Sequence, residues 1–306
     1  MLESTPTALG RTIVLTAPTA RAEIGTVAAV LRSSTVADVA VTEFVPETGP
    51  PPLGCGIVLA PWPNRVRDAR WTLDGVEQRL DITEPARANA IHGLLRNTEY
   101  VVRDRSTESV TLAALIPPQH GWPFLLDTTV RYTLRPDGLA VTHGATNHSQ
   151  RPAPWAVGAH PYLRVGDFPI EDLILTAHAG TAYAVDDRKN PTGEHPVDGT
   201  PNDLRAGVRV GDLDLDTAYG AVRPVDGVAA RLAAPDGSTV DLLLPEDWGH
   251  LQVFTPRNFP RDGGVGLAVA VEPMSASPDA LNSGVGLRWL APGESVESTW
   301  ALRYTP

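Results

Sequence analysis

Residues 129–139 read TVRYTLRPDGL, and this short stretch indicates the fold class of the chain. Val130, Tyr132 and Leu134 alternate with polar residues, which is the period-two pattern of a strand with one buried face. The dipeptide Asp137-Gly138 follows the strand and is typical of a tight turn with positive φ. The segment therefore predicts an antiparallel β-hairpin.

The same features recur along the chain. The 27 glycines and 29 prolines exceed the usual combined share of roughly 12 % of residues and indicate many turns. No window of 12 residues has a helical stripe, and at most a short helical turn is expected at 277–281. Further strands are expected at 239–244, 266–271 and 296–304, and further Asp-Gly turns at 74–75, 198–199, 226–227, 236–237 and 262–263. An all-β sandwich or barrel is therefore predicted.

The chain is predicted to form one domain over residues 1–306, because no linker, repeat or low-complexity tract divides it. Residues 186–211 are polar and rich in Pro and Gly, and they are long for a connection. They are interpreted as a loop that is either mobile or one wall of a site.

Charge and cysteine content limit the partners. The formal net charge is −11, and no run of Lys or Arg is present, so nucleic acid and anionic membranes are poor partners. A small molecule remains compatible with this charge. The single cysteine, Cys55, excludes an intramolecular disulfide and has apolar neighbours, so a buried position is expected.

The location is predicted from the ends and the hydropathy of the chain. Residues 1–5 lack a basic region followed by an apolar run, so no signal peptide is expected. No stretch of 18 apolar residues is free of charge, so no membrane span is expected. The prediction is a cytoplasmic protein. Its oligomeric state is left open.

Six polar residues occur where an all-β chain should have core or plain loop, and each alone has a structural explanation. A histidine beside Gly or Pro is usually a hydrogen-bonded structural group, and Glu272, which ends the apolar run 267–271 before Pro273, could be a solvated strand end. No metal-ligand spacing, phosphate loop or dinucleotide fingerprint is present, so neither metal nor cofactor is expected. The six candidates are Asn64, Arg65, His92, His160, Asp216 and Glu272.

Together these residues lie in segments that resemble the aldose 1-epimerase (galactose mutarotase) family. The resemblance runs in order along nearly the whole chain. Its segments are LAPWPNRV (59–66), IHGL (91–94), HGWPF (120–124), GAHPYL (158–163), LDTAY (215–219), VEPMSA (271–276) and DALNSG (279–284). Many members have an asparagine before the position of His160, where this chain has Ala159, as in a bacterial subgroup.

The resemblance implies a large antiparallel β-sandwich (a supersandwich) that holds a sugar in an open cleft. It implies Glu272 as the catalytic base and His160 as the catalytic acid. Arg65, His92 and Asp216 match positions that bind the sugar, and Asn64 adjoins them. The implied reaction interconverts the α and β anomers of a hexose of the glucose or galactose type, without cofactor or metal.

Ring opening needs a base at the C1 hydroxyl and an acid at the ring oxygen. A glutamate with an ordinary pKa of about 4.3 is ionised at neutral pH and can be the base. We expect a nearby carboxylate to favour the protonated form of His160, which is the acid required. Trp62, Trp71 or Trp155 could stack on the sugar or belong to the core.

Three other functions remain open from the residues. A hexose-6-phosphate mutarotase would need a basic cluster, which Arg65, Arg67 and Arg70 could supply. A glycosidase could use Glu272 with Asp216, since such enzymes place two carboxyl groups about the scissile bond. A non-catalytic carbohydrate-binding protein of the same fold would bind sugar without turnover.

Overall fold

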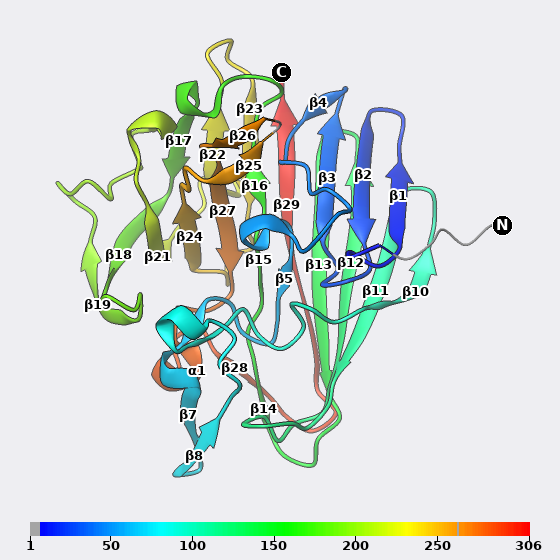
Figure 1. Cartoon of the computed structure of the whole chain (residues 1–306), viewed down its shortest axis with the longest axis vertical. Helices are drawn as coiled ribbons and strands as arrows, with labels where there is room; N and C mark the ends of the chain where they lie inside the picture. The colour runs from blue at the N-terminus through cyan, green and yellow to red at the C-terminus, as the bar shows by residue number, and fades with distance from the viewer. Residues whose placement is uncertain (1–6, 262) are drawn as a thin grey trace.

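The computed structural model describes residues 7–261 and 263–306, and antiparallel strands dominate it. Two large sheets form most of the molecule (Figure 1). The nine-stranded sheet has the order β10 (Val101–Arg105), β11 (Ser109–Ile116), β12 (Leu126–Arg135), β13 (Gly138–Asn147), β29 (Ser295–Thr305), β23 (Thr239–Leu243), β22 (Val228–Ala233), β17 (Ile174–Ala177) and β20 (Val208–Arg209). The eight-stranded sheet has the order β19 (Pro191–Pro196), β18 (Ala179–Val185), β21 (Asp216–Val222), β24 (His250–Phe254), β27 (Val269–Met274), β15 (Gly158–Ala159) and β5 (Val58–Leu59), and β16 (Tyr162–Leu163) also pairs with β27.

Smaller elements complete the fold. A four-stranded sheet contains β1 (Thr12–Thr16), β2 (Ala20–Gly25), β3 (Leu31–Val36) and β4 (Val39–Ala40). Four ribbons pair β6 (Arg65–Val66) with β9 (Ala90–Ile91), β7 (Arg70–Leu73) with β8 (Val76–Arg79), β14 (Ala153–Trp155) with β28 (Arg288–Leu290), and β25 (Phe259–Arg261) with β26 (Gly264–Gly266). The short helix α1 (Ala280–Ser283) overlaps the predicted helical turn. Within the described ranges, no helix has the length and apolarity needed to cross a membrane.

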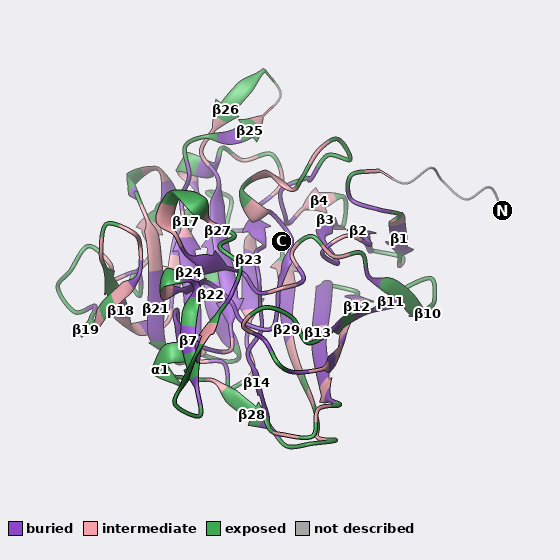
Figure 2. Ribbon diagram, turned by 60° about the horizontal axis from the view of Figure 1, so that its bottom comes forward, coloured by how far each residue is buried: buried purple, intermediate pink, exposed green. Residues whose placement is uncertain are grey.

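The predicted all-β sandwich is confirmed, and one large apolar cluster holds its layers together. Side chains of both large sheets and of the four-stranded sheet meet in this cluster, as Val130, Val271 and Leu15 illustrate. Buried residues run through the middle of the strands (Figure 2). Full burial of one such side chain contributes roughly 1.5–3 kcal/mol.

The hairpin at residues 135–138 is confirmed, but its glycine has a different cause from the one expected. The turn between β12 and β13 consists of Pro136 and Asp137, and neither Asp137 nor Gly138 has a positive φ. A Cβ added to Gly138 would lie 1.9 Å from the carbonyl oxygen of Leu302 in β29. Glycine is therefore needed for the close approach of β13 and β29.

Other turn predictions have mixed outcomes. Both residues of Asp74-Gly75 and of Asp226-Gly227 have positive φ, as tight turns require. Asp262 of the pair at 262–263 lies outside the described residues, as do residues 1–5, on which the signal-peptide prediction depends.

The prediction of one irregular loop over residues 186–211 is wrong. The segment contains β19, which is the edge strand of the eight-stranded sheet, and β20 at the edge of the nine-stranded sheet. β19 has the sequence PTGEHP and mostly exposed side chains, so it has no apolar alternation to signal a strand. The segment is a strand because it pairs with β18, and not because of its own sequence pattern.

The prediction that Glu272 ends its strand is also wrong, because β27 continues through Pro273 to Met274. The backbone N–H groups of Val271 and Ser275 both donate toward the 157–161 segment, to Pro161 and Val157. N–H groups alternate along a strand, so the donor that Pro273 lacks would also face this side. The neighbouring strand is interrupted there between β15 and β16, and on the other side β24 pairs without a break.

Candidate active site

Three polar side chains meet in the middle of the eight-stranded sheet because of strand register. On one side of β27, Gln252 of β24 pairs with Glu272. On the other side, Gly158 pairs with Met274 and Tyr162 with Ala270, so the residue midway, His160, lies opposite Glu272. Residues opposite each other in a sheet project from the same face. The central strand thus places Glu272 between an amide and an imidazole.

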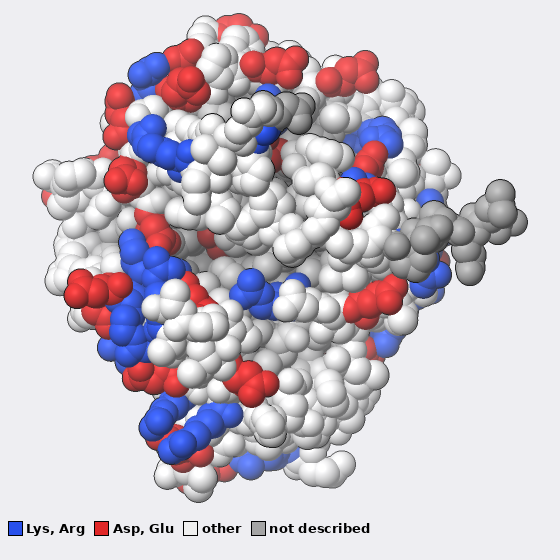
Figure 3. All heavy atoms as spheres, in the orientation of Figure 1, with Lys and Arg blue, Asp and Glu red and all other residues white. Residues whose placement is uncertain are grey.

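These side chains form part of a cavity of about 460 Å³, a volume suited to a small ligand. The face of the molecule shown in Figure 3 is hollowed near its middle, with acidic and basic atoms at the hollow. The polar and charged residues of the cavity are Asn64, Arg65, Thr83, Glu84, Arg87, His92, Arg96, His160, Asp216, Gln252 and Glu272. Phe254 supplies an aromatic surface.

The ribbon of β6 and β9 supplies a second group of side chains. Arg65 pairs with Ile91 in antiparallel register, so the start of β6 and the end of β9 lie together. The backbone N–H of His92 donates to the carbonyl oxygen of Asn64 at 2.9 Å. Gly93 then has a φ of +72°, and a Cβ there would lie 2.0 Å from the carbonyl oxygen of Ala60. A glycine after His92 is therefore required to fold this turn.

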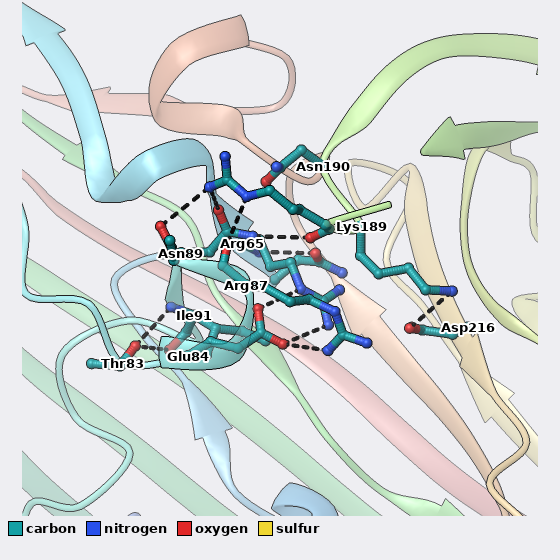
Figure 4. Close-up of polar contacts among 12 residues, drawn as sticks. Arg65, Thr83, Glu84, Arg87, Asn89, Ile91, Lys189, Asn190 and Asp216 are labelled. Atoms are coloured by element: carbon teal, nitrogen blue, oxygen red, sulfur yellow. Dashed lines mark hydrogen bonds and ion pairs between the residues drawn. The ribbon is translucent and has the colours of Figure 1, made fainter. Parts of the chain in front are cut away.

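A chain of hydrogen bonds crosses the floor of the cavity. Asn64 Nδ2 donates to Gln252 Oε1 at 3.0 Å, and Gln252 Nε2 donates to Asp216 Oδ1 at 2.8 Å. Asn64 Oδ1 accepts the backbone N–H of Arg65, so both polar ends of Asn64 are engaged. Lys189, from the turn before β19, pairs with Asp216 at 3.4 Å (Figure 4). The chain fixes the carboxylate of Asp216 at the cavity edge.

A second carboxylate, Glu84, lies between two arginines. Arg65 donates to both carboxylate oxygens, from Nε at 2.8 Å and from Nη2 at 3.0 Å (Figure 4). Arg87 donates to Glu84 at 2.7 Å. Burial would raise the pKa of Glu84, but these bonds and positive charges hold it below its usual value. Glu84 is therefore ionised at neutral pH, and much of the Arg65 fork is engaged.

His160 and Glu272 form a close buried pair. His160 Nε2 lies 3.3 Å from Glu272 Oε1, and both side chains are nearly inaccessible to water. Burial lowers the pKa of His160 to about 4. Burial also raises the pKa of Glu272 well above its ordinary value, helped by the negative charge of Asp216. The expectation of a glutamate with an ordinary pKa and a protonated histidine is therefore wrong for the free protein, because desolvation disfavours both charged forms.

The pair retains unused hydrogen-bonding capacity. Glu272 Oε2, His160 Nδ1 and His92 Nδ1 are buried and have no hydrogen-bond partner among the described residues. Buried polar atoms are normally paired, so these are candidates to contact a polar ligand. Tyr162 stacks on the His160 ring at a centroid distance of 5.3 Å, and the edge of His92 contacts it at 5.5 Å. The imidazole of His160 is thus held in a fixed orientation.

The spacing of residues along the chain predicts no metal site, but the fold brings three possible metal ligands together. One ligand atom each from His92, His160 and Glu272 lies within 4.8 Å of the other two. Spacing could not reveal this set, because its members come from three separate segments. Two imidazoles and a carboxylate could hold a divalent ion, and they could equally exchange protons with an organic ligand.

All six residues selected from the sequence line the cavity, and others around it were missed. The tryptophans considered for sugar stacking, Trp62, Trp71 and Trp155, are buried in the core. Of the basic cluster considered for phosphate, Arg67 and Arg70 pair with acidic groups elsewhere. Five further polar residues at or beside the cavity were not predicted from the sequence: Glu84, Arg87, Arg96, Gln252 and Lys189. Gln252 had a findable signal, since it is a polar residue inside an apolar strand.

This fold agrees with comparisons with known proteins. A family model described as aldose 1-epimerase matches residues 11–303, and the chain belongs to that family. A curated relative, the uncharacterised protein YihR of Escherichia coli K12, is 33 % identical over 240 residues, which cover 78 % of this chain and 75 % of YihR.

Solved structures share the fold. A galactose mutarotase-like protein from Clostridium acetobutylicum is 17 % identical with a TM-score of 0.83, covering 96 % of this chain and 95 % of that one. Galactose 1-epimerase from Lactobacillus acidophilus is 18 % identical with a TM-score of 0.79, covering 96 % of this chain and 94 % of that one.

Proposed function

We propose that the protein is an aldose 1-epimerase that interconverts the α and β anomers of a hexose, with Glu272 as base and His160 as acid, in one domain. A mutarotase-type function follows from the family. The observation that supports Glu272 as base and His160 as acid is their 3.3 Å contact in a sugar-sized cavity.

The proton count of the pair matches the reaction. Ring opening removes the proton of the C1 hydroxyl and adds one to the ring oxygen, so it needs an ionised Glu272 and a protonated His160. Both oxygens are bonded to C1, so adjacent protein atoms can reach them. After opening, Glu272 carries the proton and His160 is neutral, which is the state that burial favours. Rotation about C1–C2 and the reverse transfers give the other anomer.

The starting ionic state needs only a shift of one proton within the pair. A single proton on Glu272 can move to His160 across 3.3 Å when a sugar binds and supplies hydrogen bonds to the charged forms. Such placed proton transfers typically contribute 10²- to 10⁴-fold in rate. The base and the acid exchange roles in ring closure, so the two directions use the same two states.

The remaining residues are assigned to binding and positioning. His92 adjoins His160 and has an unpartnered Nδ1 that can contact a ring substituent. Asp216 can accept hydrogen bonds from sugar hydroxyls, and Arg65 can donate from the part of its guanidinium that Glu84 leaves free. Asn64 acts through Gln252, because both of its polar ends are engaged within the protein.

The environment of Glu272 favours this function over a glycosidase or a passive binding protein. Its 3.3 Å partner is an imidazole, so the close titratable pair is a carboxyl group and an imidazole, whereas a glycosidase uses two carboxyl groups about 5 to 9.5 Å apart. Burial of two titratable groups against each other is costly for a protein that only binds sugar, whereas proton exchange uses it.

Exchange between anomers at equilibrium tests the proposal directly. Proton NMR exchange spectroscopy on glucose, galactose and their C6-substituted derivatives should show faster α–β exchange with the protein than without it. Binding of these sugars in calorimetry without faster exchange would contradict the enzyme assignment. Release of reducing sugar from an aryl glycoside would indicate a glycosidase instead.

A further inference from the structure

Arg96 differs from every other charged residue of the cavity. It is half-buried and lines the cavity, and its guanidinium makes no hydrogen bond or ion pair in the part of the chain that the structure describes. The carboxylate near it, Glu84, is already bound by Arg65 and Arg87. Its positive charge lies near enough to both His92 and His160 to lower their pKa values. Partial burial of a guanidinium without a partner is unfavourable unless a ligand supplies one.

The other charges of the cavity are matched. Glu84 has Arg65 and Arg87 as partners, and Asp216 has Lys189. Burial raises the pKa of the third carboxyl group, Glu272, and so disfavours its charged form. The charges at the cavity therefore leave a positive excess, although the whole chain has a net charge of −11. A positive cavity in an acidic protein concentrates anionic ligands.

Sugar chemistry indicates where a negative charge would lie. In a pyranose, the ring oxygen and the C6 substituent are both attached to C5. His160, assigned to the ring oxygen, is one of the two imidazoles that Arg96 approaches. Arg96 and His160 line the same cavity, and the orientation that puts the C6 substituent beside Arg96 is part of the inference. A guanidinium binds the paired oxygens of phosphate, sulfate and carboxylate groups through parallel hydrogen bonds.

We propose that the preferred substrate is an aldohexose with an anionic oxygen group at C6, and that Arg96 binds this group. The inference rests on the proposed mutarotase function and narrows its substrate class. It also replaces the cluster of Arg65, Arg67 and Arg70 considered from the sequence, since Arg67 and Arg70 pair elsewhere.

A substrate panel separates this inference from the function on which it rests. Exchange spectroscopy would compare glucose with glucose 6-phosphate, glucose 6-sulfate and glucuronate, each corrected for its spontaneous rate. We expect kcat/KM to be at least ~10-fold higher for one or more of the anionic sugars than for glucose, since a charge-assisted bond has about this effect. Their ranking would identify the oxygen group.

The outcomes are distinguishable. Equal or better turnover of glucose than of all three anionic sugars would overturn the inference and leave the proposed function intact. No acceleration with any of the four sugars, nor with galactose and its C6-substituted derivatives, would overturn both.

Variants test the role of Arg96 itself. Arg96→Gln should lower the ratio of kcat/KM for the best anionic sugar to that for glucose by on the order of 10- to 100-fold, and Arg96→Lys should retain part of it. Arg135→Gln is the matched control, because Arg135 is exposed beside the β12–β13 turn. An unchanged ratio in Arg96→Gln would contradict the assignment. If that variant does not fold, the preference of the wild-type protein should still decrease with ionic strength, and a salt-independent preference would contradict the assignment equally.

Discussion

Lowering the pH from 7 to 5 should leave most of the mutarotase activity intact. The reaction needs a pair that carries one proton in total, on either His160 or Glu272. When a second proton binds, both residues are protonated and no ionised carboxylate is left to act as base. The pKa of His160 is lowered to about 4, so about 90 % of the pair retains a single proton at pH 5. A histidine with an ordinary pKa of about 6.5 would leave only about 3 % in that state.

The measurement is kcat/KM by NMR exchange between pH 3.5 and 8, with the spontaneous rate subtracted at each pH. The acid limb should have its midpoint near the lowered pKa of His160, and an alkaline limb should follow the raised pKa of Glu272. Near-ultraviolet circular dichroism at pH 5 controls for loss of fold. An acid midpoint near 6.5 in a folded protein would refute the burial argument.

Two further predictions concern stability. Gly138→Ala should destabilise the protein by at least ~2 kcal/mol in urea unfolding, because its Cβ would collide with the carbonyl oxygen of Leu302; Gly249→Ala, whose Cβ would meet nothing within 4 Å, is the control and should be nearly neutral. His143, which accepts a hydrogen bond from Trp300 Nε1, has its pKa lowered by burial to about 3. At pH 5 His143 binds a proton in the unfolded chain but not in the folded one. Its contribution to the free energy of unfolding is therefore fully present above about pH 6.5 and decreases as the pH falls toward 3, by about 2 kcal/mol between pH 7 and 5. His143→Gln should reduce the pH dependence of the unfolding free energy by that amount, and an unaltered pH dependence would show that His143 is not the titrating group.

The long strands β12 and β29 could be predicted from the sequence because apolar and polar residues alternate along them. β12 and β29 alternate apolar and polar residues over most of their length, so their pattern shows in the sequence. Strands such as β6 and β15 have two residues each and no detectable period. β19 is mostly exposed and rich in proline, so only its pairing with β18 shows that it is a strand.

Six residues of the site could be predicted from the sequence, but several of their neighbours and the electrostatics of the site could not. Glu272 and His160 were selected because polar residues interrupt apolar runs and because their segments resemble a family. The register that aligns them across β27 depends on pairings between distant segments. Their pKa values depend on burial, which sequence spacing does not give. Arg96 was missed because it lies in a polar connection without a pattern.

Glu272 is proposed to exchange a proton with the anomeric hydroxyl, and the variant Glu272→Gln removes that exchange while leaving the rest of the site in place. Glutamine keeps the shape of the side chain but cannot accept the proton, so kcat for anomer exchange should decrease by at least ~100-fold with the fold retained. His160→Asn should cause a similar loss. A folded Glu272→Gln variant that exchanges anomers at nearly the wild-type rate would contradict the account.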